Sequence, residues 1–254
     1  FRGCVSMLGR VLLVFTILSL YSFATTNNKI ALLTFDDGPI KATKNIIETV
    51  REENIPVTMF FVGCQIENFP NIYKDAINYP NILIANHTYS HAKNRYRKFY
   101  SDPLLVVEDI KKANSIVGVD NISNTSSAFL PVRLAGRNVF RLPTITKNDN
   151  MIDKIQREKE IVGYDNIYKE GYYIYGWDVE WAYEKNGKPI LTPQEIYNSM
   201  EKIYEKKLSS KEDKVVLLMH DFMFSNNFDG KENLKTLIQL LKNGGWSFEN
   251  IENY

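Results

Sequence analysis

Cysteine and histidine are scarce in this chain of 254 residues, and its charge is nearly balanced. Its two cysteines are Cys4, which lies in an N-terminal leader, and Cys64, so the mature fold is expected to contain no intramolecular disulfide. Basic and acidic side chains number 31 and 30, which gives a formal charge of +1. This balance argues against a polyanionic partner held by a basic patch, so we expect no nucleic-acid binding.

The chain also lacks internal repeats, low-complexity linkers and a recognisable second binding module. Its residues are 44% hydrophobic and 13% aromatic, a composition typical of a globular protein. The length is sufficient for one sizeable core. We therefore expect a single folded domain and a monomer.

Long apolar runs are absent except near the N-terminus. Residues 11–20 form an apolar run of ten that follows Arg10 and leads to small residues at Ser22 and Ala24. This pattern predicts a secretory signal peptide, residues 1–24, cleaved after Ala24. An uncleaved membrane anchor is the alternative, although ten residues are short for a span of about 20. Export without disulfides suits a secreted or periplasmic bacterial protein with no membrane span after cleavage.

Short apolar runs alternate with amphipathic stretches in the remainder, residues 25–254. The expected strands are 30–35, 57–61, 82–85, 129–133, 172–177 and 215–219. The expected helices are 43–53, 68–78, 102–117, 149–162, 193–207 and 231–243. Polar segments 120–127 and 183–191 are expected to be loops. This alternation predicts βαβ units and a parallel sheet or barrel.

Every histidine and one acidic pair fall at the ends of expected strands. Asp36 and Asp37 follow the first strand, and His220 ends the last one. His87 and His91 follow the strand at 82–85, and their spacing of four predicts that both rings lie on one face of a helical turn. Because parallel strands in a barrel bring their carboxyl ends to one rim, we expect these residues to meet there.

This set of side chains indicates metal-assisted hydrolysis of an amide or ester. Two imidazoles and one carboxylate are typical ligands of zinc, with Co²⁺, Ni²⁺ or Mn²⁺ as alternatives. The second carboxylate is free to act as general base towards water, and a histidine across the site can protonate a leaving group. A glycosidase is disfavoured, because adjacent residues rarely hold their carboxyl groups about 5 Å or more apart across one bond.

Three short motifs resemble those of a known family, the polysaccharide deacetylases (NodB homology domain, carbohydrate esterase family 4). Residues 34–39, Thr-Phe-Asp-Asp-Gly-Pro, resemble its first motif, and residues 87–91, His-Thr-Tyr-Ser-His, resemble its second. Residues 218–220, Leu-Met-His, resemble its fifth. The resemblance covers roughly 29–245. It implies a distorted, incomplete (β/α) barrel of about seven parallel strands that removes N- or O-acetyl groups from a glycan.

The resemblance also implies a role for each matching residue. Asp36 would be the general base, and His220 the general acid. Asp37 and the two histidines of the second motif, His87 and His91, would hold the metal. Leu218 would line the pocket for the acetyl methyl group, and the metal and a backbone N–H would stabilise the oxyanion.

The third motif of the family, roughly Arg-Pro-Pro-Tyr-Gly, is altered in this chain. Arg133 and Arg141 both compete for its arginine. We favour Arg133, because it ends an expected strand and Gly136 follows it; Gly136 would then lie beside the substrate. The expected role of the arginine is to orient the base carboxylate by a bidentate pair. The alternative is a solvated charge at the rim.

The fourth motif is also altered, and residues 177–181 read Trp-Asp-Val-Glu-Trp. Asp178 or Glu180 is expected to polarise His220, and Trp181 to wall the pocket. Aromatic residues are dense nearby, and either glycan stacking or ordinary packing explains them. They are Tyr164, Tyr168, Tyr172, Tyr173, Tyr175, Trp177, Trp181 and Tyr183.

The resulting hypothesis is a metal-dependent N-deacetylase acting on an acetylated cell-wall or surface glycan. An O-acetyl esterase or small-amide hydrolase with the same metal site is the second hypothesis. A third is a non-catalytic glycan-binding protein that keeps the fold, which the altered middle motifs motivate.

Overall fold

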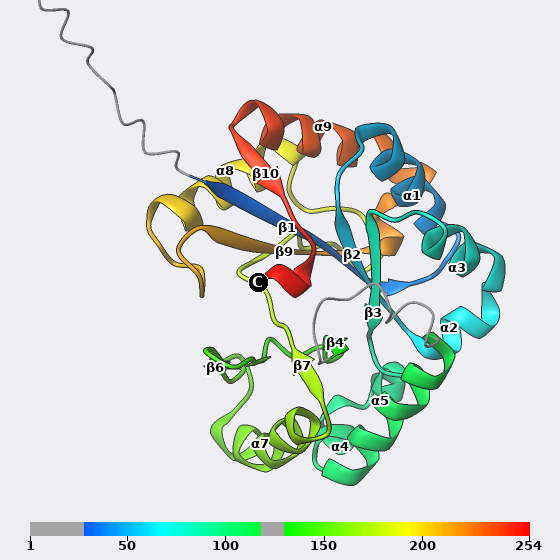
Figure 1. Cartoon of the computed structure of the whole chain (residues 1–254), viewed down its shortest axis with the longest axis vertical. Coiled ribbons are helices and arrows are strands. Elements are labelled where there is room, and N and C mark those ends of the chain that lie inside the picture. Colours follow the sequence, from blue (N-terminus) through cyan, green and yellow to red (C-terminus); the bar gives the residue numbers. More distant parts are fainter. Residues whose placement is uncertain (1–27, 118–129) are drawn as a thin grey trace, which may run out of the picture.

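The computed structural model describes residues 28–117 and 130–254. They form one curved sheet with helices around its outside (Figure 1). The strands are β1 (Lys29–Gly38), β2 (Val57–Phe61), β3 (Ile82–Asn86), β4 (Leu130–Val132), β5 (Phe140–Arg141), β6 (Thr146–Lys147), β7 (Tyr172–Ile174), β8 (Val179–Glu180), β9 (Lys214–His220) and β10 (Trp246–Phe248). The α-helices are α1 (Thr43–Glu53), α2 (Gly63–Asn68), α3 (Pro70–Ile77), α4 (Tyr96–Tyr100), α5 (Pro103–Val117), α7 (Lys154–Lys169), α8 (Pro193–Glu205) and α9 (Gly230–Asn243).

The sheet is an incomplete barrel. Its strand order is β6-β5-β7-β4-β3-β2-β1-β9-β8, with β10 beside the start of β1. All pairs are parallel except those that β5 makes with β6 and β7. In the described part of the chain, the end strands β6 and β8 do not pair with each other, so the barrel stays open. This confirms the expected fold.

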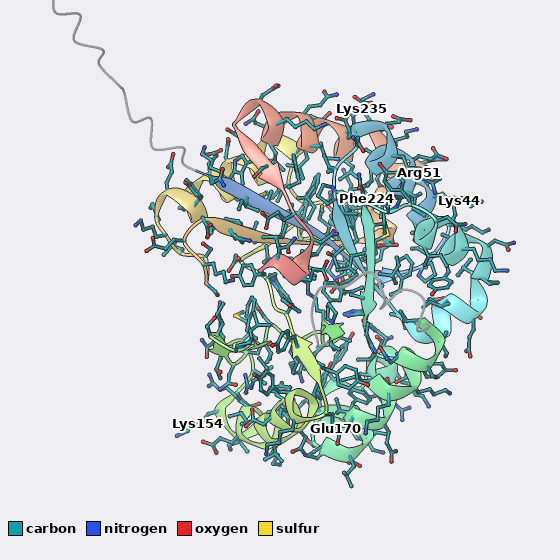
Figure 2. The ribbon with its side chains drawn as sticks, viewed as in Figure 1. Lys44, Arg51, Lys154, Glu170, Phe224 and Lys235 are labelled. Carbon is teal, nitrogen blue, oxygen red and sulfur yellow. The ribbon has the colours of Figure 1, made fainter. Side chains whose placement is uncertain are left out.

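The two faces of the strands divide the core into an outer and an inner layer. In β1, Leu33 and Phe35 pack in the layer that faces the helices, whereas Ile30 and Leu32 pack in a separate inner cluster. The same alternation holds in β2, β3 and β9, because successive side chains on a strand point to opposite faces. Figure 2 shows Phe224 within the molecule and charged residues such as Lys154 and Glu170 at its edge.

The C-terminal residues complete the inner cluster. Ile251 and Tyr254 are buried in it, and the backbone N–H of Ile251 donates to the hydroxyl of Thr58 on β2 over 3.0 Å. The ring of Tyr254 lies 5.6 Å from that of Phe140. The inner face of the barrel is therefore filled with side chains at this level.

Most expected elements are present, with shifted boundaries. The helix expected at 149–162 begins only at Lys154, after its N-cap Asp153, and runs on to Lys169. The helix expected at 68–78 corresponds to α3, which begins at Pro70, and the separate helix α2 precedes it. The loop expected at 120–127 and the signal peptide expected at 1–24 lie outside the described residues. None of the described helices has the length and apolarity needed to cross a membrane.

Candidate functional site

The carboxyl ends of the strands surround a cleft of about 540 Å³. Every second side chain of these strands points to the inside of the barrel. This alternation brings Asp36 of β1, Leu218 and His220 of β9, and His87 after β3 into the cleft. The residues that line the cleft are Asp36, Asp37, His87, His91, Tyr96, Gly136, Asn138, Asp149, Met151, Trp177, Glu180, Tyr183, Leu218 and His220.

A β-bulge places the two adjacent carboxylates on the same side of β1. Asp37 has φ 74°, and the register of β1 with β2 shifts between Asp36 and Gly38. A regular strand would point Asp37 away from Asp36, whereas the bulge re-aims it into the cleft. The side chain at the next position must be absent, because a Cβ on Gly38 would overlap Asp221 and Phe61.

The segment from His87 to His91 is a tight loop rather than the expected helical turn. Thr88 has φ 65° and His91 has φ 49°, both in the left-handed region. A carboxylate oxygen of Asp109 on α5 accepts hydrogen bonds from the backbone N–H groups of Tyr89 and Ser90, at 2.7 and 3.0 Å. The prediction of a helical turn is wrong, but the loop still brings the two imidazole rings to a centroid distance of 5.3 Å.

Asp37, His87 and His91 each aim one ligand atom at a common point. Nε2 of His87 lies 3.3 Å from Oδ1 of Asp37, and Nε2 of His91 lies 2.9 Å from the same oxygen. Within the described residues, these three form a cluster whose candidate ligand atoms all lie within 4.8 Å of one another. Two imidazoles and one carboxylate at this spacing are a suitable donor set for a divalent transition metal.

The hydrogen bonding of the cluster also fits a metal. Nδ1 of His87 lies 2.9 Å from the carbonyl oxygen of Arg133, which can only accept, so Nδ1 carries the proton and Nε2 of the neutral ring presents a lone pair. That lone pair faces Oδ1 of Asp37, which is buried and has no hydrogen-bond partner among the described residues. Two lone pairs this close repel each other unless a proton or a metal ion lies between them.

The electrostatics of this corner favour positive charge. Burial opposes ionisation of Asp37, yet His87 and His91 hold the pKa of Asp37 well below its usual value. Burial would likewise lower the pKa of His87, but the Asp36 and Asp37 carboxylates raise it. Both shifts have the same cause, which is the close approach of carboxylates and imidazoles away from water.

Arg133 holds the second carboxylate of the pair. Its Nη1 donates to Oδ1 of Asp36 over 3.0 Å and to the hydroxyl of Thr34 over 2.6 Å. Its Nε and Nη2 donate to the carbonyls of Tyr175 and Gly176. Arg133 is fully buried, so it is not a solvated rim charge, and it contacts the carboxylate through one nitrogen rather than the expected bidentate pair.

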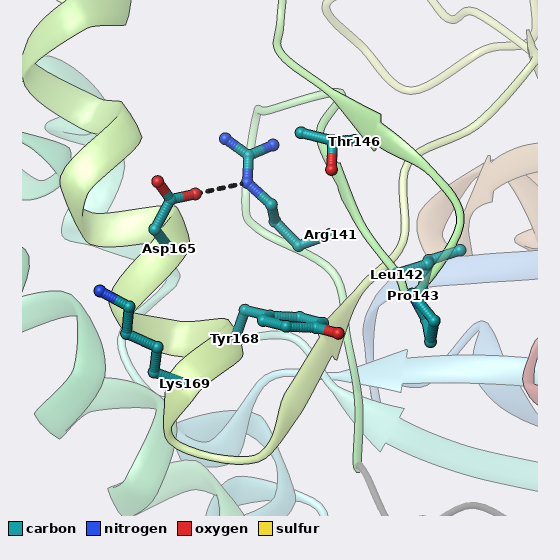
Figure 3. A pocket seen from close by; sticks show the side chains of 7 residues that line it. All are labelled: Arg141, Leu142, Pro143, Thr146, Asp165, Tyr168 and Lys169. Atoms are coloured by element: carbon teal, nitrogen blue, oxygen red, sulfur yellow. Dashed lines mark hydrogen bonds and ion pairs between the residues drawn. The ribbon is translucent and has the colours of Figure 1, made fainter.

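The competing arginine belongs to another part of the molecule. Arg141 Nε donates to Asp165 on α7 over 2.7 Å, beside a hollow between α7 and the β5–β6 hairpin (Figure 3). Its Nη atoms donate to the carbonyls of Phe140 and Lys147 and to the side chain of Asn148. This network fixes the hairpin and does not reach Asp36.

Gly136 and Leu218 both line the cleft, as expected for residues beside the substrate. Gly136 has φ 63°, and a Cβ at this position would lie 3.2 Å from the ring of Tyr96. A side chain here would therefore be strained and would crowd the cleft wall. Leu218 is 2% exposed and pairs in register with Glu180 of β8.

A family model described as polysaccharide deacetylase matches residues 23–158, more than half of the chain. This chain belongs to the polysaccharide deacetylase family. The matched segment includes both carboxylates of β1 and both histidines after β3, so the candidate metal cluster lies wholly within it.

Two curated relatives cover different shares of this family member. A peptidoglycan-N-acetylglucosamine deacetylase from Bacillus cereus is 34% identical over 44% of this chain, and the match spans 37% of the relative's length. A chitin disaccharide deacetylase from Vibrio alginolyticus is 26% identical over 95% of this chain and 75% of the relative.

Solved structures share the polysaccharide deacetylase fold of this chain at low sequence identity. The catalytic domain of a peptidoglycan N-acetylglucosamine deacetylase from Eubacterium rectale aligns over 88% of this chain and 89% of its own, with a TM-score of 0.62 and 21% identity. A CE4 esterase from Streptococcus mutans aligns over 89% of this chain and 87% of its own, with a TM-score of 0.64 and 18% identity.

The fourth-motif predictions for this family member need correction. The Asp178 carboxylate accepts hydrogen bonds from the backbone N–H groups of Ser210 and Val216, at 3.2 and 2.9 Å, and does not polarise His220. Trp181 is fully buried in the outer core, where its indole N–H donates to the carbonyl of Leu191 over 2.8 Å. It does not wall the cleft.

His220 lies in the cleft without the polarising carboxylate expected for it. Its Nδ1 is buried and has no hydrogen-bond partner among the described residues, and Glu180 does not supply one. Burial lowers the pKa of His220, against the opposing effect of the Asp37, Asp36 and Glu180 carboxylates.

Several residues that line the cleft have no sequence pattern that predicts their position. Tyr96, Asn138, Asp149 and Met151 come from α4 and from loops near the β5–β6 hairpin, where no local pattern indicates the cleft. Of the aromatic residues considered as a glycan platform, only Trp177 and Tyr183 line it.

Proposed function

We propose that this protein is a metal-dependent carbohydrate N-deacetylase that acts on an acetylated cell-wall or surface glycan. The observation that carries this proposal is the separation of roles in the β1 pair. Asp37 converges with His87 and His91, whereas Oδ1 of Asp36 accepts from its own arginine and Oδ2 of Asp36 lies 3.7 Å from Nε2 of His87.

Asp37, His87 and His91 would hold the metal, and zinc is the ion that this donor set favours. When bound there, it would supply a Lewis acid that polarises the acetyl carbonyl and lowers the pKa of water. The backbone carbonyl of Arg133 orients one of these ligands, since it accepts a hydrogen bond from Nδ1 of His87 and thereby directs Nε2 into the site.

The residues of the chain account for the proton transfers. Asp36 is the base: Arg133 fixes one oxygen, and the other accepts the proton of the attacking water. A bond forms between the water oxygen and the acetyl carbon, and the bond between that carbon and the amide nitrogen breaks. His220 donates a proton to the departing nitrogen, so that acetate and a free amino sugar result.

The cleft wall supports a sugar substrate. Leu218 provides an apolar contact for a methyl group, and Trp177 offers a ring face on which a sugar ring can stack. The names of the relatives from Bacillus cereus and Vibrio alginolyticus point to N-acetylglucosamine in peptidoglycan or chitin fragments. We propose that the protein is secreted or periplasmic after cleavage of residues 1–24, and that residues 25–254 form the catalytic domain.

The proposal is tested by acetate release from chitin oligomers, peptidoglycan and bacterial surface polysaccharides, with zinc and with a chelator. We expect release from at least one N-acetylated glycan, loss of release with chelator, and recovery when zinc is restored. Faster release from an O-acetylated glycan than from any N-acetylated one would favour the esterase alternative. Stoichiometric glycan binding with no release at any zinc concentration would favour a non-catalytic binding protein.

A further inference from the structure

His220 raises a question that its predicted role as general acid leaves open, namely what fixes its ring. A general acid works efficiently only if its proton is aimed at the leaving atom. In many acid–base sites a carboxylate does this through a hydrogen bond to Nδ1. In the described part of this chain Nδ1 of His220 has no partner, and Asp178 is committed to the backbone of β9 and of the preceding loop.

Two aromatic rings flank the imidazole instead. Phe222 stacks on it, with a centroid distance of 5.5 Å and an interplanar angle of 25°. Tyr183 meets it edge to face, with a centroid distance of 4.9 Å and an angle of 69°. The two aromatic rings also contact each other at 4.5 Å and 81°, so the three rings form one packed unit.

The loop that carries Tyr183 is itself held against this unit. Tyr183 pairs with Pro189 in an antiparallel bridge, and the backbone N–H of Ile190 donates to the carbonyl of Ala182 over 2.9 Å. Gly187 at the tip has φ 90°, and a Cβ there would lie 3.1 Å from the ring of Phe222. The tip therefore packs directly on Phe222, and a glycine is needed for its approach.

We propose that Tyr183 and Phe222 are positioning residues that orient the imidazole of His220 by ring packing, in place of a hydrogen-bonded carboxylate. This inference rests on the proposed function. Because Nδ1 is the buried nitrogen and His220 lines the cleft, the packing presents Nε2 to the substrate. Tyr183 also lines the cleft, whereas Phe222 does not, so substitution of Phe222 tests the packing on His220 without removing a side chain from the cleft.

The dependence of turnover on the leaving group distinguishes a positioning role from a merely structural one. An amide nitrogen must be protonated to depart, whereas a nitrophenolate departs without a proton. Tyr183→Ala and Phe222→Leu are therefore compared with the wild-type full chain, loaded with zinc, on a chitin oligomer and on 4-nitrophenyl acetate. His220→Asn is the reference for complete loss of the acid.

For both variants we expect kcat on the oligomer to fall roughly 10- to 100-fold, the scale of a misplaced catalytic group. KM for the oligomer and turnover of the ester should change less than about threefold, well under the tenfold step that 1.4 kcal/mol represents. Tyr183→Phe keeps the ring and should restore amide turnover. In the double variant of Tyr183→Ala with His220→Asn, the first substitution should add little, because both act on one group.

Equal loss on both substrates, or a full additional loss from Tyr183→Ala in the His220→Asn background, would overturn the positioning role. A rise in KM without a fall in kcat would also overturn it and would assign Tyr183 to sugar stacking. Thermal unfolding shows whether each variant is folded. If one variant is not folded, the kinetics of the variant at the other position test the proposal. Failure of the wild-type protein to release acetate from any glycan would instead reject the proposed function.

Discussion

Arg133 donates a hydrogen bond to Asp36 across 3.0 Å in a place where neither side chain is more than 4% exposed. The guanidinium also packs over the ring of Phe60 at 4.3 Å, and its other N–H groups donate to a hydroxyl and two carbonyls. A buried charge with this many partners is strongly oriented, so Arg133 fixes the position of the proposed base.

Arg133→Lys should therefore impair turnover more than folding. The lysine keeps the positive charge but cannot reproduce the fork of donors, so we expect kcat to fall about 10- to 100-fold, as for other residues that orient catalytic groups. Arg133→Met, which leaves Asp36 buried and unpaired, should destabilise the fold by about 3–5 kcal/mol. Acetate release measures the effect on turnover, and chemical denaturation measures the effect on stability. A wild-type kcat in the lysine variant would show that Arg133 does not orient the base.

His87→Ala should abolish the stabilisation that zinc gives the folded protein. One bound ion at 100 times its Kd stabilises a protein by about 2.7 kcal/mol, and Nε2 of His87 is one of three converging ligand atoms. The measurement is the shift of the melting temperature on adding zinc to chelator-treated protein. His220→Ala is the matched control, because it removes an imidazole from the same cleft outside the ligand cluster and should keep the shift. An unchanged zinc response in His87→Ala would contradict the assignment.

The two tryptophans of the fourth motif should respond in opposite ways. Trp177→Ala should raise KM for an oligosaccharide roughly tenfold, or ~1.4 kcal/mol, because Trp177 lines the cleft. Trp181→Phe should leave KM unchanged and lower the free energy of unfolding by about 1–3 kcal/mol, because the carbonyl of Leu191 loses its buried donor. Steady-state kinetics and urea denaturation separate these effects. A higher KM in Trp181→Phe, with no change of KM in Trp177→Ala, would indicate that Trp181 lines the cleft.

Asp221 should make the metal-free protein less stable as pH rises. Burial raises the pKa of Asp221 to about 8, while the hydroxyl of Thr43 donates a hydrogen bond that opposes the rise. The folded state therefore holds this proton when the unfolded state has lost it, so its stabilisation is complete below pH ~4 and disappears towards pH 8. In between, the contribution falls by up to ~1.4 kcal/mol per pH unit.

Asp221→Asn retains an acceptor for Thr43 but does not titrate, so the variant should lose this part of the pH dependence. Urea denaturation of chelator-treated wild-type and variant protein between pH 4.5 and 8 gives the difference. Parallel stability curves for the two proteins would show that Asp221 ionises normally in the folded state.

The site was predictable from the sequence where chemistry depends on residue type and strand position. The acidic pair and the histidines are rare residues at the ends of apolar runs, and parallel topology is sufficient to bring strand ends together. The β-bulge at Asp37 has no comparable sequence signal, although it is what turns the second carboxylate into the cleft. Of the two arginines that compete for the third motif, Arg133 contacts Asp36, whereas Arg141 contacts Asp165.

The fourth motif was not predictable for a different reason. Strand β8 contains only two residues, too few for an alternating pattern to show which side chains face the cleft. Glu180 faces it, while Val179 and Trp181 face the helices, and Asp178 caps backbone groups of a neighbouring strand. Likewise, the packing of Tyr183 on His220 depends on how a loop folds back over β9, which no local spacing encodes.

The most direct test of the separation between base and metal ligands is Asp36→Asn. Because Asp36 lies outside the ligand cluster and Asn is isosteric, the variant should bind one equivalent of zinc, while the loss of the carboxylate that pairs with buried Arg133 should lower its unfolding temperature. Its acetate release from the best glycan should fall about 10²- to 10⁴-fold, the usual contribution of a general base. Wild-type release by zinc-loaded Asp36→Asn protein, or loss of its zinc, would contradict the assignment of Asp36 as the base.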